Sequence, residues 1–273
     1  MPKKKDSVIG NMRIDKSVMI GMNLKEELNK LFYAKEDYDA ELEMLKFQYD
    51  NEEEERVGLH ASAISSWGSG SCYRQQVLSL FYKQKQGENT YINLKRIFEE
   101  GKSIGTKWQR LFIRGKVGIK EDMDVSRMVE EYDLSYTPDA KIKINGKTYV
   151  VEIKSMNTKL FQEGKSHSSG KKQLKLYMYF EKQPLGFILI EDKNTQDFRC
   201  EVVTNVTGAD PDISDIVERL EKIQEYKRTF LKKKKMVARH EKCVSASCPK
   251  ARNCPMQDAC WNVGKGRVKI NSK

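Results

Sequence analysis

The sequence predicts an α/β fold in which a mixed central sheet is flanked by helices. Helical periodicity fills most of the first 113 residues, and strand-like runs, one helix, two more strands and a closing helix follow in that order. Within the strand-like part, Asn145-Gly146 separates two runs rich in β-branched residues. That pattern is the strongest short-range signal for a hairpin with a two-residue turn.

The first 56 residues predict an N-terminal helical arm or helical hairpin that is mostly exposed. The spacing of its apolar residues is only partly that of an amphipathic helix, and an acidic run at 52–55 ends it. No residue in the arm indicates chemistry, so we expect it to bind a partner protein. The partial apolar stripe consists of Leu24, Leu28, Leu31, Phe32, Leu42, Met44 and Leu45.

The rest of the chain, 57–273, is expected to form a second domain. A loop of small residues spans 60–72 and a polar loop spans 157–170. Helices are expected at 73–85, 91–113, 171–182 and 212–239, and strands at 127–135, in both hairpin arms, at 185–191 and at 197–204. Gly101-Lys102-Ser103 mimics part of a phosphate-binding loop. Arg96 stands in place of its first glycine and no strand precedes it, which excludes that motif.

Positive charge is concentrated at the C-terminal end. The chain carries a net charge of +11, and the stretch 227–273 has 14 basic and only 2 acidic residues. Such asymmetry indicates a polyanionic partner. We expect Lys232, Lys233, Lys234, Lys235 and Arg239 to bind nucleic-acid phosphates without reading sequence.

The sequence also predicts a cytoplasmic protein with no membrane association. No apolar run approaches the roughly 18 residues of a transmembrane helix, and the start lacks the apolar segment of a secretory signal. In a reducing compartment, six cysteines favour metal binding over disulfides.

The hairpin itself predicts a cation site. If its loop is Asn145-Gly146, counting back along both strands places Asp139 opposite Glu152. Lys154 lies on the same face as Glu152, because side chains alternate along a strand. Facing carboxylates destabilise a sheet unless a cation lies between them, and Mg²⁺ prefers such oxygen ligands. A surface hairpin with a chance charge cluster is the alternative.

Several motifs together resemble the PD-(D/E)XK nuclease superfamily. Pro138-Asp139 followed by Glu152-Ile153-Lys154 matches its core pattern, and Gln173 to Tyr177 looks like the Q-x-x-x-Y motif of the RecB-like branch. The stretch from Phe98 to Gln109 is similar to that branch's first helix. The cysteine arrangement resembles that of the branch's iron–sulfur nucleases, with one cysteine before the core, Cys72, and three after it, Cys248, Cys254 and Cys260. These nucleases include CRISPR-associated exonucleases, the AddB nuclease domain and phage proteins.

The resemblance implies a restriction-endonuclease-like core and metal-dependent hydrolysis of DNA. It implies an exonuclease acting on single-stranded DNA in recombination, repair or phage DNA processing, in a bacterial or phage-infected cell. Asp139, Glu152 and the Ile153 carbonyl would hold Mg²⁺ or Mn²⁺, and Lys154 would orient the attacking water. Gln173 and Tyr177 would position Lys154 or a DNA phosphate, and Arg74 would contact nucleic acid.

The resemblance also implies a 4Fe–4S cluster, held by Cys72, Cys248, Cys254 and Cys260. The segment 241–262 would then fold back onto Cys72. Cys243 can substitute for Cys248, because the spacing before Cys254 differs from the family pattern. Zinc held by the four C-terminal cysteines is the rival.

The chain departs from the family at Gly105, where the branch carries a metal-binding histidine. Water or Glu100 would replace that ligand, or activity would be weak. A catalytically weak DNA-binding or scaffold protein with a zinc site is therefore the alternative function. Of the remaining candidates, His167 is expected to be exposed to solvent, and Cys200 to be a buried apolar filler.

Overall fold

The computed structural model describes residues 16–50, 58–68, 71–82 and 92–262. The acidic run at 52–55, the residues before Lys16 and the basic tail after Asn262 lie outside the described residues, so the predictions made for them are not addressed.

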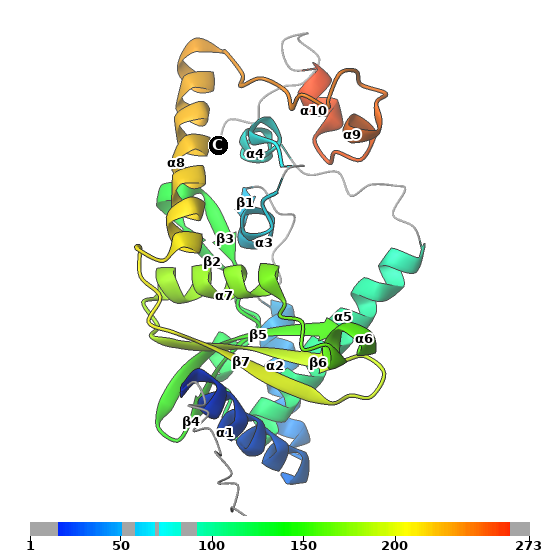
Figure 1. Ribbon diagram of the computed structural model, residues 1–273, viewed down its shortest axis with the longest axis vertical. Coiled ribbons are helices and arrows are strands. Elements are labelled where there is room, and N and C mark those ends of the chain that lie inside the picture. The colour runs from blue at the N-terminus through cyan, green and yellow to red at the C-terminus, as the bar shows by residue number, and fades with distance from the viewer. Residues whose placement is uncertain (1–15, 51–57, 69–70, 83–91, 263–273) are drawn as a thin grey trace, which may run out of the picture.

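A four-stranded mixed sheet forms the centre of the molecule (Figure 1). The strands are β4 (Ala140–Ile144), β5 (Lys147–Met156), β6 (Leu185–Asp192) and β7 (Phe198–Thr204). They lie in the order β4-β5-β6-β7. The β4–β5 hairpin and the β6–β7 pair are antiparallel, whereas β5 and β6 run parallel and are joined through α6 (Thr158–Gln162) and α7 (Ser168–Glu181). With helices on both faces, the fold is α/β with a mixed central sheet flanked by helices, as predicted.

A smaller sheet lies beside the first, with strand order β1-β3-β2. It consists of β1 (Leu59–His60), β2 (Arg127–Val129) and β3 (Leu134–Tyr136). The prediction of a single strand at 127–135 is wrong, because a 3₁₀ turn at Glu130–Tyr132 separates β2 from β3. Asp133 closes that turn with a left-handed backbone, φ 49°, and its carboxylate accepts hydrogen bonds from Gln224 and Lys227 of α8.

The helices mostly occur where helical periodicity predicted them. They are α1 (Lys16–Lys30), α2 (Tyr38–Asp50), α3 (Ala61–Ser65), α4 (Tyr73–Ser79), α5 (Ile92–Arg114), α6 (Thr158–Gln162), α7 (Ser168–Glu181), α8 (Pro211–Lys233), α9 (Pro249–Arg252) and α10 (Gln257–Asn262). Two short helices, α3 and α6, replace stretches predicted as loops. The α6 helix begins because the Asn157 side chain accepts the backbone N–H of Leu160.

Each face of the central sheet has its own apolar core. On one face α7 and α8 cover Val150, Ile188 and Ile190. On the other, α1 and α5 cover Val151 and Ile153. Strand β5 is therefore buried on both sides, and its alternation directs Glu152 and Lys154 toward the α7 side.

The described part of the N-terminal arm packs against the central sheet. Leu24 and Leu28 of α1 are buried in the core beside Phe198 of β7. Gly21 approaches β7 so closely that an added Cβ would lie 2.6 Å from the Cys200 carbonyl oxygen. The prediction that this arm is mostly exposed is therefore correct only for its outer face. That the arm forms a separate domain stays a prediction.

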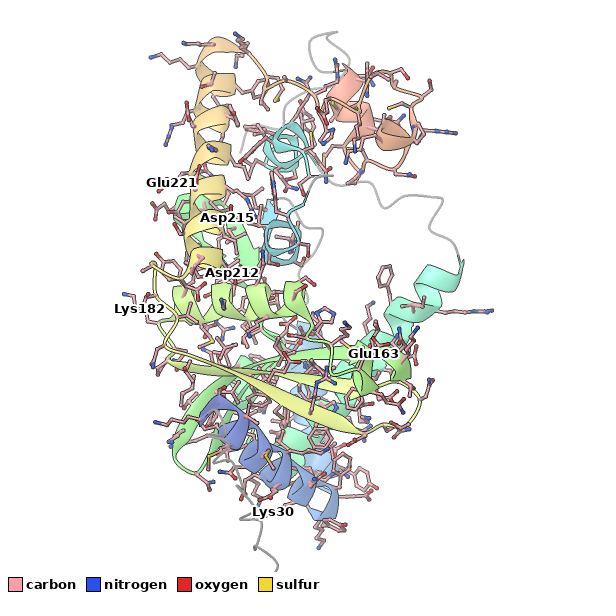
Figure 2. The ribbon with its side chains drawn as sticks, in the orientation of Figure 1. Lys30, Glu163, Lys182, Asp212, Asp215 and Glu221 are labelled. Atoms are coloured by element: carbon pink, nitrogen blue, oxygen red, sulfur yellow. The ribbon has the colours of Figure 1, made fainter. Side chains whose placement is uncertain are left out.

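Helix α8 is shorter than predicted. It ends at Lys233, and Lys234 caps it with a left-handed backbone, φ 52°. In Figure 2 the acidic residues Asp212, Asp215 and Glu221 lie along the lower half of α8, while the lysine-rich end is at the top of the view. No described helix has the length and apolarity needed to cross a lipid bilayer.

Candidate active site

The β4–β5 hairpin has the predicted register. Ile144 pairs with Lys147, and the recorded ladder continues to Ala140 and Val151, one step before Asp139 and Glu152. The two turn residues Asn145 and Gly146 have φ values of 50° and 75°, which a type I′ turn requires. The turn therefore sets the register that brings the two carboxylates to the open end of the hairpin.

Asp139 is fixed from two sides. Its Oδ2 accepts the backbone N–H of Ile153 at 2.5 Å, and its carbonyl accepts a hydrogen bond from Gln109 Nε2 at 2.8 Å. Burial raises the pKa of Asp139 to about 6, although the Lys154 charge and the Ile153 N–H act in the opposite direction.

Glu152 is the most unusual carboxylate in the site. It is only 1% exposed, and one of its oxygens, Oε1, pairs with Lys154. The other oxygen, Oε2, is buried with no hydrogen-bond partner among the described residues. Burial, followed by the negative charge of Asp139, raises the pKa of Glu152 to about 8. An unpaired buried carboxylate oxygen is costly, so this arrangement calls for a cation or a proton.

Lys154 remains a cation at neutral pH. Burial lowers its pKa, but the charges of Glu152 and Asp139 outweigh burial, and the pKa lies above its ordinary value. The lysine therefore acts as a fixed positive charge and hydrogen-bond donor, not as a base.

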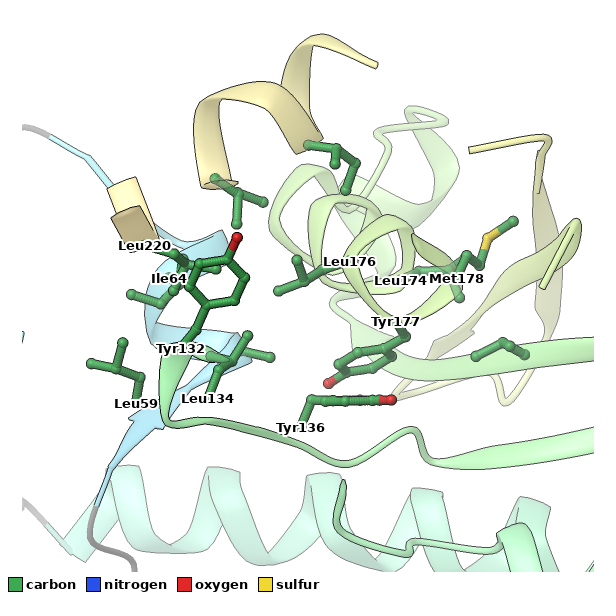
Figure 3. Packing of buried hydrophobic residues seen from close by; sticks show 14 of the residues in the cluster. Leu59, Ile64, Tyr132, Leu134, Tyr136, Leu174, Leu176, Tyr177, Met178 and Leu220 are labelled. Atoms are coloured by element: carbon green, nitrogen blue, oxygen red, sulfur yellow. The ribbon is translucent and has the colours of Figure 1, made fainter. Parts of the chain in front are cut away.

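Gln173 and Tyr177 lie one turn apart on α7, as predicted, and play different parts. Gln173 lines the cleft described below and donates a hydrogen bond to the Tyr177 hydroxyl. Tyr177 is buried in the core, where its ring stacks on Tyr136 at a centroid separation of 5.5 Å (Figure 3). Burial, with Glu152 adding to it, raises the pKa of Tyr177 well above its ordinary value. Tyr177 thus positions Gln173 from within the core.

A cleft of about 910 Å³ opens beside these residues. Asp139, Lys154 and Gln173 line it, with contributions from α2, α5 and the start of α7. Several further residues lining it were not predicted, and two of them, Asp124 and Gln48, interact with the site. Asp124 lies close enough that its charge raises the pKa of both Asp139 and Glu152. Gln48 of α2 donates to Gln109 at 3.1 Å. Both come from segments without a motif, so no sequence signal pointed to them.

His167 is not the solvent-exposed loop residue that the sequence predicted. Its Nδ1 accepts the backbone N–H of Gly170 at 3.1 Å and so caps α7, and the side chain lines the cleft. Burial lowers its pKa, and the positive charge of Lys154 lowers it further. The predicted polar loop, 157–170, contains α6 and the start of α7, and His167 lies between these helices as the N-cap of α7.

The carboxylate pair fits a divalent cation. Among the described residues, no three or more histidine, cysteine, aspartate or glutamate side chains form a group that could hold a metal. Two carboxylates are nevertheless sufficient for Mg²⁺, which keeps several waters and substrate oxygens. Glu152 Oε2 is available to such a cation, because it has no hydrogen-bond partner among the described residues. Glu100, the suggested third ligand, instead pairs with Lys193 at 3.2 Å.

The described structure gathers cysteines from both ends of the chain. Burial raises the pKa of Cys243, followed by the effect of Cys248, and burial also raises the pKa of Cys254; Cys72 and Cys260 add to both shifts. These thiols affect one another electrostatically, but no three of them form a group that could hold a metal among the described residues. Cys248 differs, because it caps α9, and hydrogen bonds from backbone N–H groups lower its pKa.

Arg74 is not placed to bind nucleic acid as predicted. It is buried, and its guanidinium donates to Cys260 Sγ at 3.1 Å, to the Cys260 carbonyl and to the Val237 carbonyl. Arg239 is exposed but stacks on Trp261 and also donates to the Cys260 carbonyl. Both arginines thus tie the cysteine-rich segment to the body of the molecule.

Cys200, predicted as an apolar filler, lies on β7 against α1. Burial raises the pKa of its thiol to about 12, which suits a packing role.

No known family profile and no curated protein matches the sequence. Among solved structures, the chain is similar to the crystal structure of SSO0001, with 13% identity and a TM-score of 0.42 over 88% of this chain and 98% of that one. It is also similar to LHK-Exo, an alkaline exonuclease from Laribacter hongkongensis. The TM-score is 0.41 for both LHK-Exo structures, one of them a complex with dAMP. The complex is 14% identical to this chain, over 65% of this chain and 93% of that one. The other structure is 12% identical, over 69% of this chain and 96% of that one.

Proposed function

We propose that the protein is a metal-dependent deoxyribonuclease of the PD-(D/E)XK type. The observation that supports this function best is the buried Glu152, whose Oε1 pairs with Lys154 while its Oε2 has no partner among the described residues. A structural ion pair would gain nothing from leaving one carboxylate oxygen unsatisfied beside Asp139. A cation site at the edge of an open cleft accounts for that oxygen.

Each residue has a role that follows from its position. Asp139 and Glu152 hold Mg²⁺ or Mn²⁺, with the Ile153 carbonyl as a third oxygen. The cation, when bound, polarises the scissile phosphate and lowers the pKa of a bound water. Lys154 orients the attacking water and stabilises negative charge that develops on the phosphate. Gln173 positions a phosphate or Lys154, and Tyr177 holds Gln173 in place.

The proposed substrate is DNA. More specifically, we propose that the protein is an exonuclease that acts on single-stranded DNA. The exposed Lys232, Lys233, Lys234 and Lys235 at the upper end of α8 would bind the phosphate backbone, and affinity should then fall with salt. The sequence motifs alone support two further parts of the proposal. The chain belongs to the RecB-like branch, and its cysteines hold a 4Fe–4S cluster.

The test is a nuclease assay on end-labelled linear and circular single-stranded DNA, with Mg²⁺, with Mn²⁺ and with EDTA. The parent should cleave only with the cation, and circular DNA should resist an exonuclease. Lys154→Ala and Asp139→Ala should each lower the rate at least about a hundredfold, because the first removes the positive charge that stabilises the reacting phosphate and the second removes a ligand of the cation. Exposed Lys182→Ala is the matched control and should cleave like the parent.

If the parent binds DNA with a steep salt dependence but does not cleave it with either cation, the protein is the DNA-binding or scaffold alternative. If Lys154→Ala cleaves as fast as the parent, the site is assigned incorrectly.

A further inference from the structure

The first half of α5 carries large apolar side chains that no described residue covers. Residues 96–100 are all exposed, and Figure 1 shows this part of α5 projecting from the molecule. Phe98 is 59% exposed, whereas Trp108 and Phe112 on the same helix are buried. Phe98 also lines the cleft that holds Asp139 and Lys154. An aromatic ring open to the cleft of a nuclease site is available for a ligand.

Two glycines lie between Phe98 and the carboxylates. Gly101 and Gly105 are inside α5, where glycine is the least favourable residue after proline. Packing within the described structure does not require them, because a Cβ at either position meets nothing within 4 Å. Both line the cleft. Their effect is to leave the helix surface bare there, so that a ligand can approach the backbone.

These residues form a continuous path to the site. Phe98, Gly101, Gly105 and Gln109 are spaced by three and four residues and so share one face of α5. Gln109 donates to the Asp139 carbonyl, so the path ends at the candidate metal ligand. At about 1.5 Å per residue, it runs roughly 16 Å along the helix axis, the length of a few nucleotides.

We propose that Phe98 selects single-stranded DNA by stacking on an unpaired base, while the strand follows the bare face at Gly101 and Gly105 toward Asp139. This inference rests on the proposed nuclease function. Stacking on an aromatic ring tolerates any base, and it requires a base that is not already paired and stacked within a duplex. Lys102 and Lys193 at the rim pair with exposed Glu99 and Glu100, and these weak pairs can be exchanged for DNA phosphates.

The first test measures binding of a fluorescent oligodeoxythymidine to the full chain in EDTA, so that no cleavage occurs. Phe98→Ala should weaken binding about tenfold. Phe98→Tyr, which keeps the aromatic face, should bind like the parent, and Phe98→Leu, which keeps only apolarity, should bind like Phe98→Ala. Met128→Ala, a similarly exposed apolar residue outside the cleft, is the control and should have no effect. A blunt hairpin duplex should bind more weakly, and it should bind the parent and Phe98→Ala equally.

The second test separates stability from binding. Gly105→Leu should raise the thermal midpoint, because leucine favours a helix more than glycine does. It should nevertheless weaken oligonucleotide binding at least about tenfold, because the side chain fills the path. Gly101→Leu should behave in the same way, and a protein that merely misfolded would lose both properties together.

The inference is overturned if the parent does not bind the oligonucleotide, if Phe98→Leu binds like the parent, or if Gly105→Leu is stabilised without losing affinity. Cleavage with Mg²⁺ is measured separately. A parent that cleaves while Phe98→Ala binds and cleaves equally well refutes this inference alone. A parent that does not cleave, but loses binding with Phe98→Ala, refutes only the proposed nuclease function.

Discussion

Glu152 shows how one residue links the energetics of the fold to its chemistry. Its carboxylate is buried beside Asp139, and a pKa raised to about 8 means that a proton competes for this carboxylate near neutral pH when no cation is present. A divalent cation must displace that proton to bind. Affinity for the cation should therefore rise with pH until Glu152 is fully ionised, above about pH 8. The neighbouring Asp139, with a pKa of about 6, acts in the same direction.

The same residue makes stability depend on pH with a defined sign. The folded pKa of about 8 lies above the ordinary value of 4.5, so the folded state binds the proton more tightly than the unfolded state. The stabilisation is fully present below about pH 4.5 and is lost as pH rises through 8. In EDTA, the melting temperature of the parent minus that of Glu152→Gln should fall between about pH 5 and pH 9.

Mg²⁺ at about pH 9 should raise the melting temperature of the parent but not that of Glu152→Gln, because the variant lacks the carboxylate ligand. The assignment is contradicted if the difference between parent and variant rises with pH in EDTA. It is also contradicted if both proteins respond equally to the cation.

At the scale of single elements, α1 determines whether the N-terminal residues are an appendage or part of the core. Sequence periodicity predicted a helix there but not what its inner face touches. In the structure Leu28 is fully buried, and α1 packs along β7. An apolar stripe shows that a helix has an inner face, and only the folded chain shows which surface covers it.

This packing predicts a large stability difference between two positions on one helix. Leu28→Ala should lower the free energy of unfolding by about 2–5 kcal/mol, because it leaves a cavity in the core. Met22→Ala, at an exposed position of the same helix, should change it by less than about 0.5 kcal/mol. Urea unfolding followed by circular dichroism measures both. A dispensable arm would give equally small changes at the two positions.

At the scale of the whole molecule, the long α8 and the segment after it bring the chain's last cysteines to α4, which begins after Cys72. Burial raises the pKa of Cys243 and of Cys254, and Cys72 and Cys260 add to both shifts, but Cys248 adds more than either of them to the shift of Cys243. Sequence spacing alone left Cys243 and Cys248 as alternatives. Cys248 is hydrogen-bonded to Cys243 and affects its pKa more than Cys260 or Cys72 does, so Cys243 and Cys248 stay alternatives for the fourth ligand of the proposed cluster.

Anaerobic purification followed by a visible spectrum tests that arrangement. The parent should be coloured and contain iron, and Cys254→Ser should lose the colour, because four thiolates are needed to hold a 4Fe–4S cluster. Of Cys243→Ser and Cys248→Ser, the variant that removes the fourth ligand should lose it as well. Cys200→Ser, which changes a cysteine on β7, should remain coloured. A colourless parent with stoichiometric zinc would establish the rival site, and retention of colour in Cys243→Ser would assign the role to Cys248.

The sequence by itself determined the features that depend on neighbouring residues. The Asn145-Gly146 turn fixed the hairpin register, and strand alternation then placed Asp139, Glu152 and Lys154 together. Local backbone geometry is enough for that prediction, because a two-residue turn permits only one pairing. The order of helices and strands was similarly readable from hydrophobic periodicity, which gave the α/β class.

Only the tertiary structure decided which distant groups share an environment. It buried Arg74 against Cys260, placed His167 and Asp124 in the cleft, and left Phe98 exposed although its spacing resembles that of a core residue. These outcomes depend on contacts between segments far apart in sequence, and no local pattern encodes such contacts. The desolvation that raises the pKa of Glu152 has the same origin, because burial comes from the elements packed over a strand and not from the strand's own residues.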